Sequence, residues 1–477
     1  MLFSSFSFGL FLPVTLLLYW AVGFKRIKGQ NLILLAASYF FYGLWDWRFL
    51  FLIVASSLVD YFAALAIKGT ENNNNKQKLF LYSSIAWNLG VLFLFKYYNF
   101  FIDEFALLFN MQQDEYAFST LNLILPVGLS FYTFQTMSYT IDVYKNRIAP
   151  TKNLLNFLCF VSFFPQLVAG PIEKASDLLP QFSKKRSFDT VQVKEGLRQI
   201  LWGLFKKMVI ADNAAYVVNM VYASPEDYGS LSLLYASVLF FFQIYGDFSG
   251  YSDIAIGTAK LFGFNLSKNF NIPYLAKSMT EFWQRWHITL TRWFTDYVYF
   301  PIIQKNLRSS RRRNIAIFLT MGLIGLWHGA DWTFVIFGAF QGFLIVLERT
   351  PLTKKRKSSL FHNSERSNYL LPLFFILVLI FSAVLFRSLN INEAWIILHR
   401  IFSFIPSGEI GLIVNSSFLT FTILMLTLEI FTRNKDFPFS QLDKNIKRPL
   451  RWIIYYIFIF IIFQYAGFKE DFIYFQF

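Results

Sequence analysis

The sequence is poor in charge, cysteine and histidine. Only 15% of its 477 residues are Asp, Glu, Lys or Arg, whereas about a quarter of the residues in soluble domains carry charge. The single cysteine, Cys159, excludes a disulfide framework, an iron–sulfur cluster and a cysteine-rich zinc site. Four histidines are present, but no acidic or thiol group is obviously spaced to bind a metal with them. We therefore expect a non-soluble protein without a metal centre.

Several catalytic motifs are also missing from the sequence. It contains no P-loop, no dinucleotide-binding glycine fingerprint, no GxSxG elbow and no HExxH. These absences argue against ATP-driven transport, NAD-dependent redox chemistry and classical serine hydrolysis. We expect no bound cofactor.

Long apolar runs recur from end to end. Hydrophobic residues make up 55% of the chain and aromatic residues 21%, a load that lipid-facing helices can hold and a water-facing surface cannot. Runs long enough to cross a bilayer predict an all-α polytopic membrane protein. The predicted spans are 5–23, 31–45, 49–67, 79–100, 118–140, 154–171, 230–246, 314–330, 333–349, 368–386, 411–431 and 451–468.

The net charge of +15 comes from short loops between the apolar runs. The positive-inside rule explains it more simply than nucleic-acid binding, so we expect membrane lipid and no nucleic acid as a partner. Alternating the loop charges predicts that both termini lie outside the cytoplasm. The first twenty residues lack Lys and Arg, which argues against a cleaved signal peptide.

Residues 173–313 fit this alternation poorly. The Trp-rich segment 281–297, EFWQRWHITLTRWFTDY, predicts an interfacial or partly inserted helix, although a plain aromatic anchor explains it as well. The simplest division of the chain is one membrane-embedded domain.

His328 is the best catalytic candidate, because an ionisable group at membrane depth is costly and usually functional. It ends an apolar run, IAIFLTMGLIGLWHGADW, whose glycines leave room for a close helix or a substrate channel. A neutral imidazole can accept a proton from a hydroxyl at neutral pH. A structural histidine bonded to a backbone carbonyl is the alternative. His287 lies 41 positions earlier and could orient a substrate, polarise a carbonyl or bond locally.

The stretch FFQIYGDFSGYSDIAIG places Asp247 and Asp253 at the end of a predicted span, beside Tyr245 and Ser249. Acids beside hydroxyl groups can line a wet cavity in the membrane. They can equally cap the following helix. The residues alone leave both interpretations open.

Six stretches in order resemble the membrane-bound O-acyltransferase (MBOAT) family, in particular its bacterial alginate and peptidoglycan O-acetylation branch. They cover most of the signature core, 125–342. They are LPVGLSFYTFQTMSYTIDVYK, FFPQLVAGPI, GLFKKMVIADN, QIYGDFSGYSDIAIG, FWQRWHITLTRWFTDYVYFPI and LWHGADWTFVIFGAFQG.

The resemblance implies about 11–13 transmembrane or re-entrant helices around a central tunnel and funnel, in a bacterial cytoplasmic membrane. It implies that His328 is the catalytic histidine and that His287 is the second signature polar residue. It also makes further residues candidates for contacting substrate or lining the funnel: Asp247, Tyr245, Ser249, Trp327 and Asp331.

The chain divides, on this view, into a membrane domain, 1–471, and an extracytoplasmic tail, 472–477, with the sequence FIYFQF. The resemblance suggests that the tail folds into the outer funnel and that Tyr474 accepts the acyl group. A phenol leaves more readily than a sugar alcohol, so a tyrosyl ester would stay activated for onward transfer. An aromatic tail resting in the membrane interface is the alternative.

The predicted function is therefore an O-acetyltransferase that moves acetyl from cytosolic acetyl-CoA towards an exported or cell-wall polysaccharide. The resemblance, together with the lack of a long loop that could fold outside the membrane, implies an extracytoplasmic partner acetyltransferase. Within the family, the rivals are D-alanyl transfer to teichoic acid from an acyl carrier protein, and transfer to a sterol, glyceride or secreted protein. A non-enzymatic polysaccharide transporter is the rival from another class.

Overall fold

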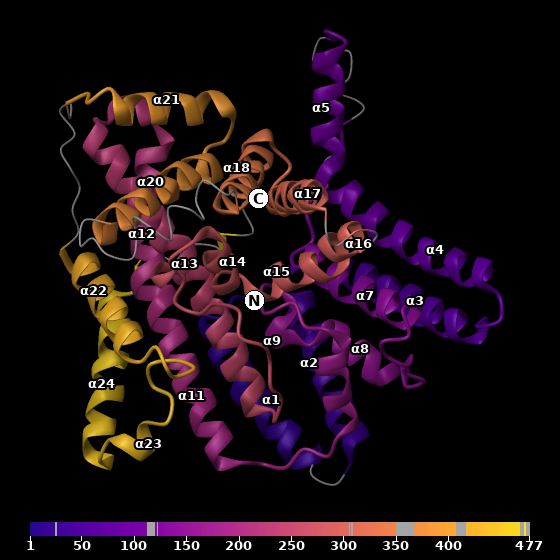
Figure 1. Cartoon of the computed structure of the whole chain (residues 1–477). Helices are drawn as coiled ribbons and strands as arrows, with labels where there is room; N and C mark the ends of the chain where they lie inside the picture. Colours follow the sequence, from indigo (N-terminus) through magenta and orange to yellow (C-terminus); the bar gives the residue numbers. More distant parts are fainter. Residues whose placement is uncertain are drawn as a thin grey trace. The chain divides into compact units, whose positions relative to one another are not determined.

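The computed structural model describes residues 1–23, 26–111, 120–121, 123–304, 306, 309–349, 367–406, 416–467 and 472–473. All regular elements in these ranges are helical (Figure 1). Contacts divide the chain into two compact units, of which the first comprises 1–200 with 254–268 and the second 201–253 with 269–477. Helices α11 (Thr190–Leu204) and α13 (Ser230–Leu261) each continue from one unit into the other.

The first unit packs its long helices around buried polar contacts. Asp60 of α3 accepts hydrogen bonds from Ser84 and Asn88 of α4 and from Thr140 of α7, so its carboxylate ties three helices together. A carboxylate in an apolar bundle is costly unless it is bonded in this way. The helices wholly inside this unit are α1 (Phe6–Gly23), α2 (Ile27–Asp46), α3 (Arg48–Gly69), α4 (Asn74–Leu92), η1 (Phe93–Tyr97), α5 (Tyr98–Leu108), α7 (Leu129–Tyr144), α8 (Leu154–Ser162), α9 (Phe164–Leu167), α10 (Ala175–Leu178) and η3 (Leu179–Ser183).

The second unit holds every described residue that the sequence marks as a site candidate. Helix α11 continues into this unit as a π-helical segment, η4 (Phe205–Ala211). Such segments are rare and often lie at functional sites. The other helices wholly inside this unit are α12 (Asp212–Ala223), η5 (Pro225–Asp227), η6 (Pro273–Leu275), α14 (Met279–Arg285), α15 (Ile288–Phe294), η7 (Thr295–Tyr299), α16 (Phe300–Ile303), α17 (Ser310–His328), α18 (Trp332–Glu348), α20 (Ser367–Arg387), α21 (Ile391–Phe402), α22 (Ser416–Phe431), α23 (Leu442–Asn445) and α24 (Arg448–Tyr465).

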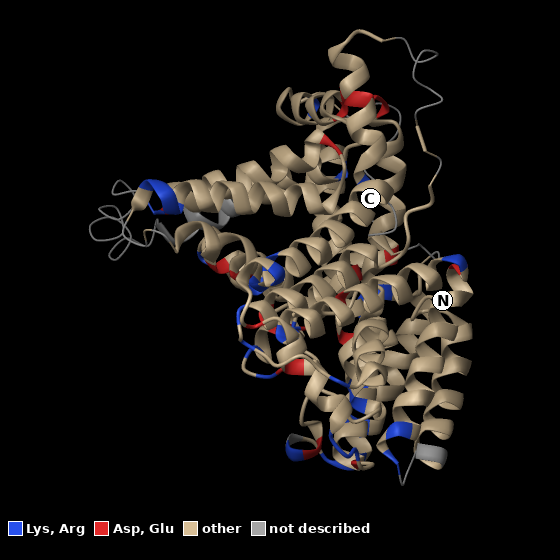
Figure 2. Ribbon diagram, turned by 90° about the vertical axis from the view of Figure 1, so that its right-hand side faces the viewer, with Lys and Arg blue, Asp and Glu red and all other residues tan. Residues whose placement is uncertain are grey.

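The predicted class, an all-α membrane protein, is confirmed. Among the described residues, three helical stretches are long and apolar enough to cross a membrane: Arg48–Gly69, Asn74–Leu108 and Ser230–Leu261. Lys and Arg lie mostly near helix ends and in connections, and long stretches of helix carry no charge (Figure 2). Large apolar side chains are exposed on these stretches, as at Phe51 with 79% exposure. Such a surface suits lipid rather than water.

Four expected elements are wrong in detail. Within the predicted span 118–140, the helix, α7, begins only at Leu129. The span 154–171 is broken into α8 and α9, and α13 runs on past 246 to Leu261. Segment 281–297 is not one helix, because α14 ends at Arg285 and α15 begins at Ile288. The break lies at His287, whose φ of 42° is left-handed, and Ile288 N donates to Asn269 O instead of continuing the helix.

Candidate functional site

His328 is held at the end of a tight helical hairpin formed by α17 and α18. It is the last residue of α17, and Asp331 caps α18 by accepting a hydrogen bond from Thr333 N at 2.8 Å. Gly325 and Gly338 allow the two helices to touch. A Cβ on Gly325 would lie 2.2 Å from Phe334 O, and one on Gly338 would lie 2.3 Å from Met321 O. The hairpin therefore fixes His328 through backbone contact.

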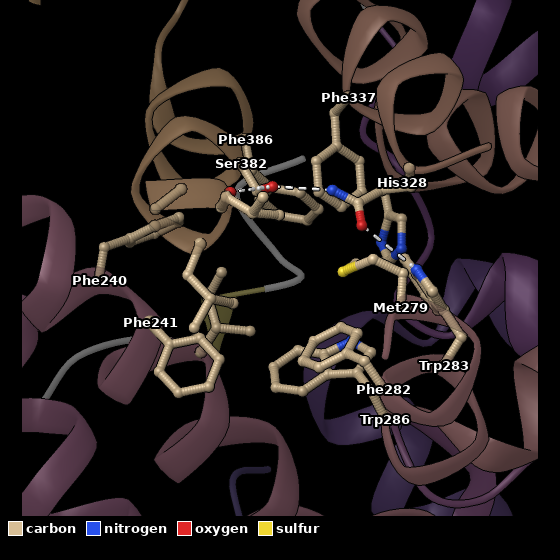
Figure 3. A pocket seen from close by; sticks show the side chains of 15 residues that line it. Phe240, Phe241, Met279, Phe282, Trp283, Trp286, His328, Phe337, Ser382 and Phe386 are labelled. Atoms are coloured by element: carbon tan, nitrogen blue, oxygen red, sulfur yellow. Dashed lines mark hydrogen bonds between the residues drawn. The ribbon is translucent and has the colours of Figure 1, made fainter. Parts of the chain in front are cut away.

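The His328 imidazole lines an apolar pocket. Mostly apolar pockets with a few polar groups are typical of small-molecule sites. In Figure 3 the imidazole lies on the side shared with Phe337 and Trp283, with Phe240 and Phe241 of α13 across the pocket. His328 itself is only 2% exposed. The lining residues are Phe240, Phe241, Ile244, Met279, Phe282, Trp283, Trp286, His328, Phe337, Gln341, Val378, Leu379, Ser382, Ala383 and Phe386.

Three polar side chains, those of Trp283, Gln341 and Ser382, form a chain of hydrogen bonds along the pocket wall. Trp283 Nε1 donates to Gln341 Oε1 at 3.3 Å, and Gln341 Nε2 donates to Ser382 Oγ at 2.8 Å (Figure 3). Ser382 Oγ donates in turn to Val378 O at 2.6 Å. The polar groups are thus bonded to one another. His328 is the titratable residue among the lining side chains, so it is the residue there that can move a proton.

His287 is fully buried between α14 and α15, outside the apolar spans. Its Nδ1 lies 3.2 Å from Asn269 Oδ1, which also accepts from Thr289 Oγ1 at 2.9 Å. Because Asn269 Oδ1 is an acceptor, Nδ1 carries the proton, and Nε2 is the acceptor nitrogen of the neutral ring. Burial lowers the pKa of His287 to about 3, so the ring stays neutral at ordinary pH.

Trp327 brings the two histidines together, although they are far apart in sequence. The ring centroid of Trp327 lies 5.8 Å from that of His287 and 4.9 Å from that of His328. Phe248 of α13 lies on another side of His287, with a centroid distance of 4.5 Å. The structure therefore places three predicted site residues in one aromatic cluster.

The candidates on α13 are buried but lie outside the pocket lining. The Tyr245 hydroxyl donates to Glu429 Oε2 at 2.7 Å. Asp247 pairs with Lys207, with Nζ 2.8 Å from Oδ1. Ser249 Oγ is buried and has no hydrogen-bond partner among the described residues. Of the two interpretations that the sequence left open for Asp247, capping of a following helix is excluded, because α13 continues past this position to Leu261.

Tyr474 lies outside the described residues, but the two residues before it are described. Phe472 and Ile473 are buried, with 0% and 1% exposure. The Phe472 ring lies 5.9 Å from that of Phe248 and 4.8 Å from that of Tyr251. The chain immediately before Tyr474 thus packs against α13, one ring away from His287.

Sequence reasoning missed the residues that bond the site candidates. Asn269 bonds His287, Lys207 pairs with Asp247, and Glu429 accepts from Tyr245. Glu429 could have been found, because it is the one acid in the apolar run 411–431 and an acid at membrane depth needs a partner. Lys207 stands beside another lysine in an otherwise apolar stretch, which is a similar signal. Nothing local marks Asn269 as the partner of a histidine 18 positions later.

Comparison with known proteins agrees with the resemblance in the sequence. The model of the MBOAT, membrane-bound O-acyltransferase family, matches residues 49–391. A probable alginate O-acetylase AlgI from Pseudomonas aeruginosa is 38% identical over 408 residues, covering 85% of this chain and 75% of that protein. A peptidoglycan O-acetyltransferase from Helicobacter pylori is 36% identical over 376 residues, covering 73% and 70%. A teichoic acid D-alanyltransferase from Streptococcus thermophilus is 26% identical over 318 residues, covering 62% and 76%.

Proposed function

Because the chain belongs to the membrane-bound O-acyltransferase family, we propose that it moves acetyl from cytosolic acetyl-CoA across the membrane towards an exported or cell-wall polysaccharide. The expected family, fold class and acyltransferase activity are confirmed, so a transporter without chemistry is the weaker alternative. Acetyl is favoured over D-alanyl because the relatives named as O-acetylases or O-acetyltransferases are more similar, at 35–38% identity against 26–29% for the D-alanyltransferases.

One observation carries the proposal. A continuous series of ring contacts runs from Phe472 through Phe248, His287 and Trp327 to His328, with centroid distances of 5.9, 4.5, 5.8 and 4.9 Å. A tail that merely rested in the membrane interface would not need to be buried against the histidine cluster. The contacts therefore support a tail that takes part in the reaction.

His328 acts as the general base in this mechanism. It takes the proton from an acceptor hydroxyl, proposed to be that of Tyr474, as the oxygen attacks the thioester carbonyl of acetyl-CoA. The new C–O bond forms as the C–S bond breaks, and the departing thiolate receives the proton from His328. The pocket beside His328 is lined almost entirely by apolar side chains, which suits the uncharged thioester arm of the donor.

His287 positions the acceptor in this scheme. With its Nδ1 proton donated to Asn269, the neutral ring offers Nε2 as an acceptor for a hydroxyl. That arrangement favours orienting the acceptor over polarising a carbonyl, for which a donor is needed. The tyrosyl ester then passes acetyl to an extracytoplasmic partner acetyltransferase, which modifies the polymer. Both chain termini lie outside the cytoplasm of a bacterial cell in this arrangement.

The test is mass spectrometry of the C-terminal peptide after purified protein is incubated with isotope-labelled acetyl-CoA. We expect label on Tyr474 that disappears in His328→Ala and in Tyr474→Phe. Wild-type protein without label on Tyr474 would contradict the relay or the donor. Incubation with D-alanyl carrier protein separates these two, since label from that donor alone would favour D-alanyl transfer.

A further inference from the structure

The chain beyond α24 is tied to the second unit at several points. Asn213 Nδ2 donates to Tyr465 O at 2.9 Å, and Gly467 N donates to Met208 O at 2.9 Å. Six residues later, Ile473 N donates to Asp247 Oδ2 at 2.8 Å. The C-terminal segment is thus bonded to η4, to α12 and to α13 within the same unit.

The hydrogen bond from Ile473 N reaches a buried group of paired charges, formed by Lys207, Asp212 and Asp247. Lys207 Nζ lies 2.8 Å from Asp212 Oδ1 and 2.8 Å from Asp247 Oδ1. Each of the three residues is 4% exposed or less. One ammonium therefore faces two carboxylates, and the second oxygen of Asp247 receives the Ile473 N–H. A bond from an amide to a buried carboxylate is short and strong, and its direction is fixed.

The backbone of α13 approaches the end of α11 and η4 closely enough for this group to form. A Cβ on Gly250 would lie 2.8 Å from Gly203 O of α11, and one on Gly246 would lie 3.0 Å from Lys206 O of η4. Side chains at these two positions would push the helix away. The two glycines flank Asp247 along α13, so they allow Lys207 to reach it.

Apolar burial alone would not fix the register of the tail. The Phe472 ring packs between Phe248 and Tyr251, but ring contacts tolerate sliding by an ångström or more. The Asp247 bond selects one particular backbone N–H, that of Ile473. Fixing this amide sets the point from which the next residue, the proposed acyl acceptor, continues the chain.

We infer that Asp247, oriented by Lys207, is a positioning residue that holds the C-terminal segment in one register against α13. The inference rests on the proposed function for its purpose, because a fixed register matters if Tyr474 must meet the acyl donor. The anchoring itself can be measured without any reaction.

The first experiment is hydrogen exchange of the C-terminal peptide in full-length protein purified in detergent. Asp247→Ala removes the acceptor of the Ile473 amide, so we expect its exchange to rise about tenfold or more. The matched control is Asp212→Ala, which takes the other carboxylate from Lys207 but leaves the Ile473 bond. Its exchange at Ile473 should stay within about threefold of wild type.

A second variant covers the case in which Asp247→Ala fails to fold. Asp247→Asn keeps an oxygen acceptor but loses the charge, and should give an intermediate increase in exchange. Wild-type exchange in either folded Asp247 variant would refute the inference. Equal acceleration in the Asp212 control would also refute it, because the effect would then reflect general loosening.

The reaction provides a separate readout. Labelling of Tyr474 should slow about tenfold in Asp247→Ala, with the KM for acetyl-CoA unchanged because the His328 pocket is intact. A variant that was merely unstable would change both parameters. If wild-type Tyr474 gains no label while the exchange pattern holds, the relay fails and the anchor stands. If Tyr474 is labelled while Asp247→Ala matches wild type in exchange and rate, the anchor fails and the relay stands.

Discussion

Gly325→Ala tests whether the α17–α18 hairpin positions His328. The added Cβ would lie 2.2 Å from Phe334 O, where ordinary contact begins at 3.4 Å, so the helices must part by about 1 Å. The obstructing atom belongs to the backbone and cannot rotate away. Overpacking of this kind costs about 1–3 kcal/mol. His328 stands three residues further along the same helix, and a misplacement of about 1 Å can cost roughly a hundredfold in rate.

Gly322→Ala is the matched control, on the same helix one turn earlier. A Cβ there would meet nothing within 4 Å, so the change should stabilise the helix by about 0.5–1 kcal/mol. The assay compares melting temperature and acetyl transfer of both variants in detergent. We expect Gly325→Ala to melt lower and to transfer about a hundredfold more slowly, while the control keeps its rate. A Gly325→Ala protein within twofold of wild type in rate would refute the reasoning.

Two further predictions concern the histidines. His328→Asn keeps a polar side chain in the pocket but removes the general base. We expect kcat to fall about 10²–10⁴-fold, with little change in the KM for acetyl-CoA. A fall in kcat of less than tenfold would exclude His328 as the base. The pKa of His287 is lowered to about 3 in the folded protein, while the unfolded value is about 6.5. Protonation therefore favours the unfolded state below about pH 6.5, and acidification to pH 5 should cost about 2 kcal/mol through this residue. The difference in melting temperature between pH 7 and pH 5 should shrink in His287→Asn, and an unchanged difference would contradict the buried, neutral ring.

Hydrophobic runs predicted the long helices well, because a membrane-spanning helix is determined by the residues within its own stretch of sequence. The run 49–67 corresponds to α3 (Arg48–Gly69), and the run 333–349 corresponds to α18 (Trp332–Glu348). Apolar residues in sequence order are enough to define a span, whatever the span packs against. The catalytic candidate at the end of a span was visible for the same reason.

The breaks between helices could not be predicted in this way. His287 adopts a left-handed backbone, which is uncommon for any residue other than glycine. Histidine is enriched in this conformation but adopts it rarely, so the residue type alone could not locate the break. The conformation is held by distant backbone bonds, from Ile288 N to Asn269 O and from Asn271 N to Arg285 O. Likewise, α13 passes straight through an acidic stretch because Lys207 neutralises Asp247 from 40 positions earlier.

Helix α13 couples the pocket to the tail anchor. Phe241 lines the pocket with His328, and Asp247 on the same helix holds Ile473. At 1.5 Å per residue, these two positions are about 9 Å apart along one rigid axis. The distance between Phe241 and Asp247 therefore depends on a single helix. In a site assembled from several loops, movement of any one loop would change the corresponding distance. One residue inserted between Phe241 and Asp247 would rotate the anchor by about 100° relative to the pocket, so it should abolish positioning of the tail while leaving the His328 hairpin intact.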